Sequence, residues 1–324
     1  MAEKDIQATA EKIITNWVRL KHGQSLMIVT NEKYRQEAEA LKKSAERVGK
    51  VMICYVPDMG SKDSDWVEEN LSLSNADVVI GATEYSLCTT QRVKDALNNG
   101  GRFLSLPMSV NDDRSILSYN FLNLDLDKAA EKASLLLQKI QDCKTIRVTT
   151  AKGTDVFFSM EGRIPGFFSG NCELNQGFAS ACVEVYVPIV ETSGEGVMVV
   201  DGSLGYIGKA DPEVKVRLHK GRIVSVDDSS TGQKLQKYME DFHDPEMFVA
   251  SEFGIGLNDL ARCAGDCYIE DESTYGTYHI GFGRNISLGG NHQASSHFDL
   301  VTWNPTIRFD DQILIRDGII LESS

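Results

Sequence analysis

The first 145 residues alternate short apolar runs with segments of helical length, and this alternation constrains the fold more than any other feature of the chain. The runs are SLMIVT (25–30), VMICYVP (51–57), ADVVIGA (76–82) and RFLSLP (102–107). Between the first two runs, residues 33–48 show helical periodicity. Apolar strands that alternate with helices are typical of a parallel sheet covered on both faces. We therefore predict an N-terminal, doubly wound α/β domain over residues 1–145.

The pattern changes after a predicted bridging helix at 125–142. The segments KTIRVTT (144–150) and TDVFFSMEG (154–162) alternate with period two around Lys152-Gly153, which indicates a hairpin. Further strand-like segments follow, and one amphipathic helix at about 231–242 interrupts them. The strand-like segments are VEVYVPIVE, GVMVVDGSL, VKVRLHKGRIVSVD and QILIRDGIIL. We predict a β-rich α+β domain over residues 146–324, which makes the whole chain an α/β protein of two domains.

Composition and motif absences exclude several classes of partner. The 33 Lys and Arg residues against 47 Asp and Glu give a net charge of -14, which repels nucleic acid and anionic membranes. The chain has no GxGxxG after its first strand and no Walker-type GK[ST], so no dinucleotide site is expected. It has no apolar stretch of transmembrane length and no signal-peptide pattern. Seven scattered cysteines favour reduced thiols. These features predict a cytoplasmic protein that binds neither nucleic acid nor membranes.

The segment SHFDLV places His297 and Asp299 two residues apart on a predicted strand. Period two puts both side chains on one face, with Phe298 on the other. A histidine and a carboxylate side by side on a strand form a good half of a metal site. The alternative is a half-buried strand with a surface His-Asp pair.

Three other residues add donor groups in strand-like surroundings. They are Glu184 in VEVYV, Glu252 in SEFGIG and His279 in TYHIGFG. Each also has an ordinary structural interpretation: a surface strand, an exposed strand end and a core histidine. A buried carboxylate without a partner is costly, however, and a metal ion would satisfy it. Together with His297 and Asp299 they make a suitable ligand set for two divalent metals bridged by a carboxylate.

Two neighbouring features are interpreted as structural. The acidic run 270–272 is predicted to be a solvated turn, with Glu272 as a further candidate for contact with His279. Cys263 and Cys267 lack a second pair at zinc-ribbon spacing, so we do not predict a zinc site there. His292 lies in a predicted loop, where it could contact a substrate.

These motifs resemble the ligand segments of the aminopeptidase T family of metallopeptidases, in the same order along the chain. The matching segments are EVY, EFGIGLN, EDESTYGTYHIGFGRN and GGNHQASSHFDLV. The segment ADVVIGATEYSLCTT is similar to the N-terminal domain of that family. The resemblance implies a homodimer with a small-molecule or peptide substrate and two divalent ions, zinc, cobalt or manganese. It implies that the ions are held by Glu184, Glu252, His279, His297 and Asp299. It also implies that Glu252 is the catalytic proton acceptor.

Two departures from the family weaken the peptidase interpretation. The family has a catalytic tyrosine seven residues after its first histidine, where this chain has Ile286, and the segment FASACV before Glu184 also differs. The sequence is similar, too, to 2,5-dihydroxypyridine dioxygenase, a ring-cleaving enzyme of the same fold. That resemblance implies one iron(II), held by His297, Asp299 and either His279 or Glu252. In the ring-cleaving enzyme a histidine stands at or near the position of Glu252.

The retained Glu252 favours a metallohydrolase that attacks an amide or peptide bond. The alternatives are the iron(II) dioxygenase and a binding protein on an enzyme scaffold that has lost its activity. Metal content separates the binding protein from the two enzymes, and oxygen dependence separates the enzymes from each other.

Overall fold

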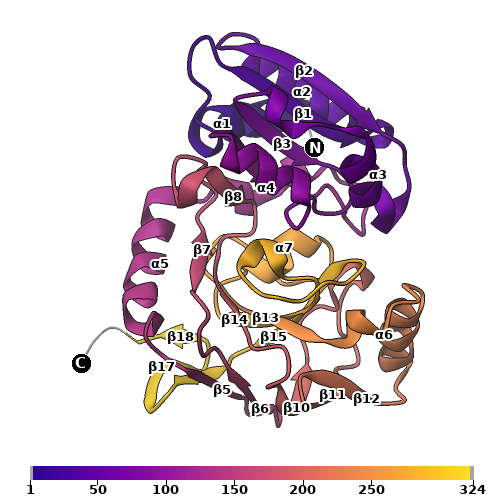
Figure 1. Ribbon diagram of the computed structural model, residues 1–324, viewed down its shortest axis with the longest axis vertical. Helices are drawn as coiled ribbons and strands as arrows, with labels where there is room; N and C mark the ends of the chain where they lie inside the picture. Colours follow the sequence, from indigo (N-terminus) through magenta and orange to yellow (C-terminus); the bar gives the residue numbers. More distant parts are fainter. Residues whose placement is uncertain (1–2, 322–324) are drawn as a thin grey trace. The chain divides into compact units, whose positions relative to one another are not determined.

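The apolar runs of the first part of the chain form a five-stranded parallel sheet in the order β2-β1-β3-β4-β8 (Figure 1). The strands are β1 (Ser25–Asn31), β2 (Lys50–Val56), β3 (Val78–Ala82), β4 (Arg102–Ser105) and β8 (Phe178–Ser180). Besides short 3-10 helices, this part contains α1 (Glu3–Lys12), the π-helix η1 (Ile13–Trp17), α2 (Arg35–Ala45), α3 (Asp63–Asn70) and α4 (Gln91–Asn98). Every residue of β3 is buried, as expected for a central strand covered on both faces.

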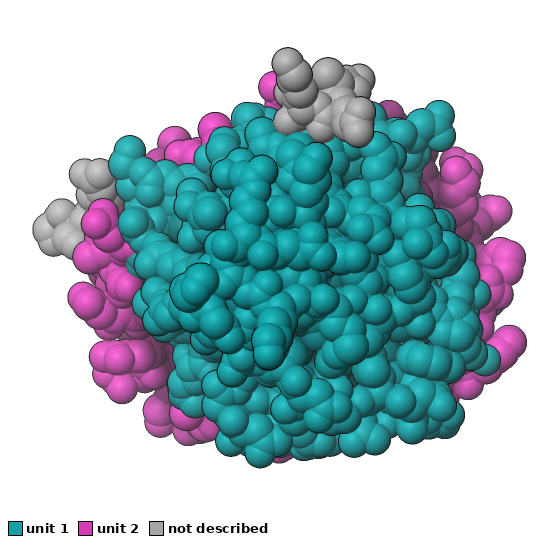
Figure 2. All heavy atoms as spheres, turned by 90° about the horizontal axis from the view of Figure 1, so that it is seen from above, with its two compact units in different colours: residues 1–130, 168–183 teal, residues 131–167, 184–324 magenta. Residues whose placement is uncertain are grey.

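The computed structural model describes residues 3–321, and its contacts divide the chain into two compact units (Figure 2). Unit 1 contains residues 1–130 and 168–183, and unit 2 contains residues 131–167 and 184–324. This division differs from the single predicted boundary after residue 145. It falls within helix α5 (Leu126–Ile140), and the chain then returns to unit 1 to add β8.

The return of the chain has a simple physical reason. Strand β4 is only four residues long and would otherwise expose its backbone groups at the edge of the sheet. Strand β8 pairs with it in parallel, with Leu104 opposite Ala179. The rings of Phe103 and Phe178 also lie 6.3 Å apart on these neighbouring strands. Such a short strand carries no periodic signal, and for this reason the sequence pattern does not indicate it.

Unit 2 contains an eight-stranded sheet in the order β12-β11-β10-β6-β5-β16-β17-β18, in which all pairs are antiparallel. The strands are β5 (Thr145–Thr149), β6 (Asp155–Ser159), β10 (Glu195–Val200), β11 (Val214–His219), β12 (Arg222–Val226), β16 (Thr306–Phe309), β17 (Gln312–Arg316) and β18 (Ile319–Ile320). The predicted hairpin is present, because β5 and β6 pair with Val148 opposite Val156. Helix α6 (Ser230–Glu240) begins after Ser229, whose side chain accepts from the Gly232 N–H.

A second sheet, most of it in unit 2, has the order β15-β14-β13-β9-β7, and its β15–β14, β14–β13 and β13–β9 pairs are antiparallel. Its strands are β7 (Gly166–Phe168), β9 (Glu184–Pro188), β13 (Ala250–Gly256), β14 (Thr277–Gly283) and β15 (His297–Trp303). One face packs toward the eight-stranded sheet, where the rings of Phe253 and Phe309 lie 6.1 Å apart. The short helix α7 (Tyr268–Ser273) contacts β13, β14 and β15 (Figure 1).

The protein thus has a mixed α/β fold with one parallel sheet and large antiparallel sheets. Every residue of β9, β13 and β14 is buried, so most of the sheet that carries the predicted ligands is buried. No helix among residues 3–321 has the length and apolarity needed to span a membrane.

Candidate metal centre

All five predicted ligands lie on the same face of the β9-β13-β14-β15 sheet. Alternate residues of a strand point to the same face, and the register between strands decides which of them become neighbours. The relevant cross-strand pairs are Glu184 with Gly256, Gly254 with His279, Glu252 with Gly281, Gly281 with Asp299, and Gly283 with His297. The antiparallel register therefore alternates the donor side chains with glycines across the face.

These glycines provide the space into which the donor side chains converge. A Cβ atom on Gly254 would lie 1.9 Å from His279 Nε2 and 2.6 Å from Glu184 Oε2. A Cβ atom on Gly281 would lie 2.6 Å from His297 Cε1 and 2.9 Å from the Cβ of Glu252. Neither glycine has a positive φ, so the requirement is for space rather than for an unusual backbone conformation.

The donor atoms form two groups that share one carboxylate. In the first group, His297 Nε2 lies 2.9 Å from Glu252 Oε2 and 3.5 Å from Asp299 Oδ1. In the second group, His279 Nε2 lies 2.7 Å from Glu184 Oε2, and Glu252 again provides the third donor. Within each group the donor atoms lie within 4.8 Å of one another. Either group could hold a metal ion.

The chemistry of this ligand set fits a divalent cation. Three carboxylates and two imidazoles are gathered in the interior, where unpaired charge is costly. Asp299 Oδ1 is buried and has no hydrogen-bond partner among the described residues. A metal ion would compensate the negative charge. Imidazole and carboxylate together suit zinc, manganese, cobalt and iron(II).

The protonation of the site without metal predicts how metal binding depends on pH. Burial raises the pKa of Glu184 to about 7, against the opposing charge of His279. Burial by itself would lower the pKa of His279, but Glu184 outweighs it and raises that pKa to about 9. Protons therefore occupy the His279–Glu184 pair near neutral pH. A metal ion held by this pair has to displace them, so its binding at that group becomes weaker as the pH falls.

Two contacts from outside the ligand set orient its members. The Nδ1–H of His297 donates to the backbone carbonyl of Arg284 at 2.9 Å, which fixes the tautomer whose Nε2 faces the site. The hydroxyl of Tyr268 donates to Asp299 Oδ2, so that Oδ1 faces His297. Sequence reasoning did not identify Tyr268. Its place on the short helix after Cys267 carries no periodic signal.

The prediction of a solvated acidic turn at residues 270–272 is wrong. Glu270, Asp271 and Glu272 lie on helix α7 and are only 6%, 1% and 6% exposed. Asp271 accepts hydrogen bonds from the backbone N–H groups of Ala264 and Gly265, so it organises the loop before the helix. Burial, followed by the charges of Asp299 and Glu184, raises the pKa of Glu272 well above its usual value. Glu272 is thus a further carboxyl group beside the ligands.

The other sequence candidates lie outside the ligand groups. Nε2 of His292 lies 3.0 Å from the Glu246 carbonyl oxygen. Cys263 and Cys267 are free thiols, and neither belongs to a metal-binding group among the described residues.

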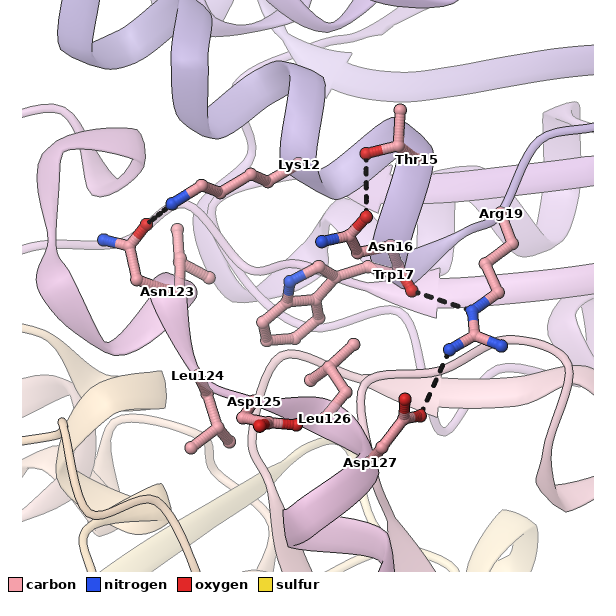
Figure 3. Close-up of a pocket in the computed structure, with 11 residues that line it drawn as sticks. Lys12, Thr15, Asn16, Trp17, Arg19, Asn123, Leu124, Asp125, Leu126 and Asp127 are labelled. Atoms are coloured by element: carbon pink, nitrogen blue, oxygen red, sulfur yellow. Dashed lines mark hydrogen bonds and ion pairs between the residues drawn. The ribbon is translucent and has the colours of Figure 1, made fainter.

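Unit 1 contains a groove of about 590 Å³ lined by the end of α1, by η1 and by residues 122–127 (Figure 3). Its charged side chains already have partners. Lys12 donates to Asn123 Oδ1, and Arg19 donates to Asp127 Oδ1 at 3.2 Å and to the Asn16 carbonyl at 3.3 Å. No metal-binding group occurs among the described residues of this unit, so the chemistry of the chain is assigned to unit 2.

Comparisons with known proteins agree with both resemblances found in the sequence. A family model described as NicX, 2,5-dihydroxypyridine 5,6-dioxygenase, matches residues 14–322. A 2,5-dihydroxypyridine 5,6-dioxygenase from Pseudomonas putida is 27% identical over 143 residues. That alignment spans 40% of this chain and only 41% of the relative.

Two solved structures share the fold. The 2,5-dihydroxypyridine dioxygenase from Pseudomonas putida superposes with a TM-score of 0.80 at 18% identity, covering 100% of this chain and 99% of that one. Wild-type AmpT from Thermus thermophilus superposes with a TM-score of 0.67 at 13% identity, covering 98% and 99% of the two chains.

Proposed function

Because the chain belongs to the 2,5-dihydroxypyridine 5,6-dioxygenase family, we propose that it is a mononuclear iron(II) enzyme that opens a hydroxylated aromatic ring with dioxygen. This was the alternative interpretation of the sequence, and the family match favours it over the metallohydrolase. The observation that carries the proposal is the group formed by Glu252, His297 and Asp299, whose donor atoms lie within 4.8 Å of one another. In such a reaction one ring bond breaks and both atoms of dioxygen enter the product.

Each residue of the site has a role in this proposal. Glu252, His297 and Asp299 would hold the ion. When bound, iron(II) supplies open coordination positions for dioxygen and the substrate hydroxyl. The His279–Glu184 pair lies beside Glu252, and we assign Glu184 the role of accepting the proton of the substrate hydroxyl. Glu184, Glu252, His279 and Asp299 are buried, so this proposal places the reacting ring against groups that have little contact with water.

A two-metal hydrolase is the second candidate, and one specific observation favours it. Glu252 belongs to both donor groups, as a carboxylate that bridges paired ions would. In this enzyme Glu184 and His279 would hold a second ion, and the pair of ions would supply an activated water and polarise a carbonyl. The fold of this chain is also similar to that of AmpT.

Metal analysis and oxygen consumption separate the two candidates. The protein is purified without oxygen, its metals are counted by mass spectrometry, and oxygen uptake is followed with hydroxypyridines and dihydroxybenzenes. One iron per chain and uptake of one dioxygen per ring opened would support the dioxygenase. Two zinc, cobalt or manganese ions per chain and hydrolysis that is independent of oxygen would support the hydrolase instead.

Ordinary peptides are expected to be poor substrates because of Ile286. This residue begins the short helix η10 (Ile286–Leu288), where the resemblance to aminopeptidase T places a catalytic tyrosine. Loss of one hydrogen-bond donor to a developing oxyanion typically lowers turnover by ~10²–10³. We expect negligible hydrolysis of aminoacyl anilides and short peptides by protein loaded with zinc, cobalt or manganese, and a measurable gain in Ile286→Tyr if the hydrolytic groups are otherwise intact. Rapid hydrolysis by the unmodified chain would contradict this expectation.

A further inference from the structure

The loop between β14 and β15, residues 284–296, is folded around the side chain of Asn285. This residue is fully buried. Its backbone N–H donates to the His292 carbonyl at 3.1 Å, and its own carbonyl accepts from the N–H groups of Leu288 and Gly290 at 3.1 and 3.0 Å. The backbone of Asn285 therefore makes hydrogen bonds that hold together the loop between two ligand-bearing strands.

The side-chain amide of Asn285 links this loop to two other segments. Its Nδ2 donates to the Ser251 carbonyl at 2.9 Å and to Glu191 Oε1 at 3.0 Å, and its Oδ1 accepts from the His292 N–H at 2.9 Å. Both donors and the acceptor of the amide are used, which a carboxylate or a hydroxyl cannot reproduce. A Cβ atom on Gly290 would lie 2.1 Å from Asn285 Cγ, so glycine is needed there for the amide to fit.

Glu191 is itself held in place. Its Oε1 also accepts from the Asn291 N–H at 2.8 Å, and its Oε2 pairs with Arg163, whose guanidinium donates to the Gly289 carbonyl at 3.4 Å. The side chains of Arg163 and Glu191 are only 9% and 14% exposed, so solvent does not screen this ion pair fully. Asn285 is thus attached to a rigid support in unit 2 rather than to a mobile surface group.

The Asn285 side chain and backbone lie next to two parts of the metal centre, one at Glu252 and one at the carbonyl that contacts His297. Ser251 directly precedes Glu252 on β13. Arg284 directly precedes Asn285, and its carbonyl accepts from the Nδ1–H of His297. Loss of the Asn285 amide contacts would therefore let β13 at Glu252 and the acceptor of His297 move independently of each other. The 2.9 Å distance between His297 Nε2 and Glu252 Oε2 depends on both.

We propose that Asn285 is a positioning residue of the metal centre, which holds the loop carbonyl behind His297 in register with β13 at Glu252. The inference rests on the proposed metal binding and goes beyond it by assigning a residue that contacts no ligand atom. Partners that orient metal ligands typically change metal affinity by about 10–100-fold when removed. The same range is expected for Asn285.

The test uses cobalt(II) as a spectroscopic probe in competition with a chelator. Asn285→Asp keeps the shape of the side chain but loses both donated bonds and brings a carboxylate against Glu191; Asn285→Ala removes all three bonds. Asn291→Ala is the matched control, because Asn291 lies in the same loop, is exposed, and reaches Glu191 through its backbone. We expect the dissociation constant of cobalt(II) to rise about 10–100-fold in both Asn285 variants, with an altered cobalt absorption spectrum, and to stay unchanged in the control.

The possible failures are distinguishable. If the wild-type protein binds no cobalt(II), the proposed function fails first. If it binds, and folded Asn285 variants match it in affinity and spectrum, or if Asn291→Ala loses as much, the inference about Asn285 is wrong. Should neither variant fold, hydrogen exchange of the wild-type protein decides. The His292 amide, which donates to Asn285, should then exchange more slowly with cobalt(II) bound, and equal rates with and without the ion would overturn the proposal.

Discussion

Replacement of His297 or Asp299 by alanine is expected to leave the purified protein without bound metal and to lower turnover by at least about 10³-fold, as for groups that act as one unit. His297 Nε2 lies 2.9 Å from Glu252 and 3.5 Å from Asp299, so it contacts both carboxylates of its group. Without His297, the group has only two acidic donors. Without Asp299, Tyr268 loses its acceptor as well. Metal content by mass spectrometry and turnover with reconstituted protein measure both effects.

The controls for this prediction separate ligand loss from unfolding. His219→Ala removes an exposed histidine on β11 that pairs with Glu195, and it should retain wild-type metal content and turnover. Asp299→Asn keeps the volume of the side chain and an acceptor for Tyr268 but removes the charge, so it should bind metal more weakly than the wild type while it folds normally. Full metal occupancy in His297→Ala or Asp299→Ala would contradict the role of these residues as ligands.

The local part of the site could be predicted because it depends on neighbouring residues. Period two is enough to place His297 and Asp299 on one face, and the structure has both on β15 with Phe298 buried on the other side. The alternation around Lys152-Gly153 likewise predicted the β5–β6 hairpin correctly. In both cases the sequence separation is small, so a pattern within one strand or turn contains the information.

The register between distant strands could not be predicted in the same way. Glu184 and His279 meet only because β9 and β14 both pair with β13, in registers that place Glu184 opposite Gly256 and His279 opposite Gly254. A slip of one residue would place one of the two on the opposite face. Residue type and local surroundings made these residues candidates, and the resemblance to known families supported grouping them, but no periodicity predicted that they would meet.

The prediction of a solvated turn at residues 270–272 was wrong for a different reason. Three consecutive acidic residues are usually solvated, and composition alone favoured that interpretation. Here Asp271 satisfies backbone N–H groups of the preceding loop, while Glu272 faces the ligand cluster. Burial of this run depends on partners that are invisible in the local sequence. The return of the chain to form β8 was missed because that strand has only three residues.

Two glycine-to-alanine substitutions on adjacent strands should separate a one-metal site from a two-metal site. The methyl group of Gly254→Ala would meet His279 Nε2 at 1.9 Å and Glu184 Oε2 at 2.6 Å, so this pair has to move. The methyl group of Gly281→Ala would meet His297 Cε1 at 2.6 Å and the Cβ of Glu252 at 2.9 Å. Each substitution therefore disturbs one donor group first, and the backbone at both positions accepts alanine.

If the protein is the proposed mononuclear dioxygenase, Gly254→Ala should keep one iron per chain, because Glu252, His297 and Asp299 are not among the atoms its methyl group meets first. Its turnover should fall by about 10²–10⁴-fold, the usual contribution of a positioned proton acceptor. Gly281→Ala should lose both iron and activity. Circular dichroism and iron content of the two variants, measured side by side, make each the control for the other. Loss of all metal in both variants would favour paired ions bridged by Glu252. Full metal content in both would show that the site can accommodate the methyl groups and that the glycines are not needed for space.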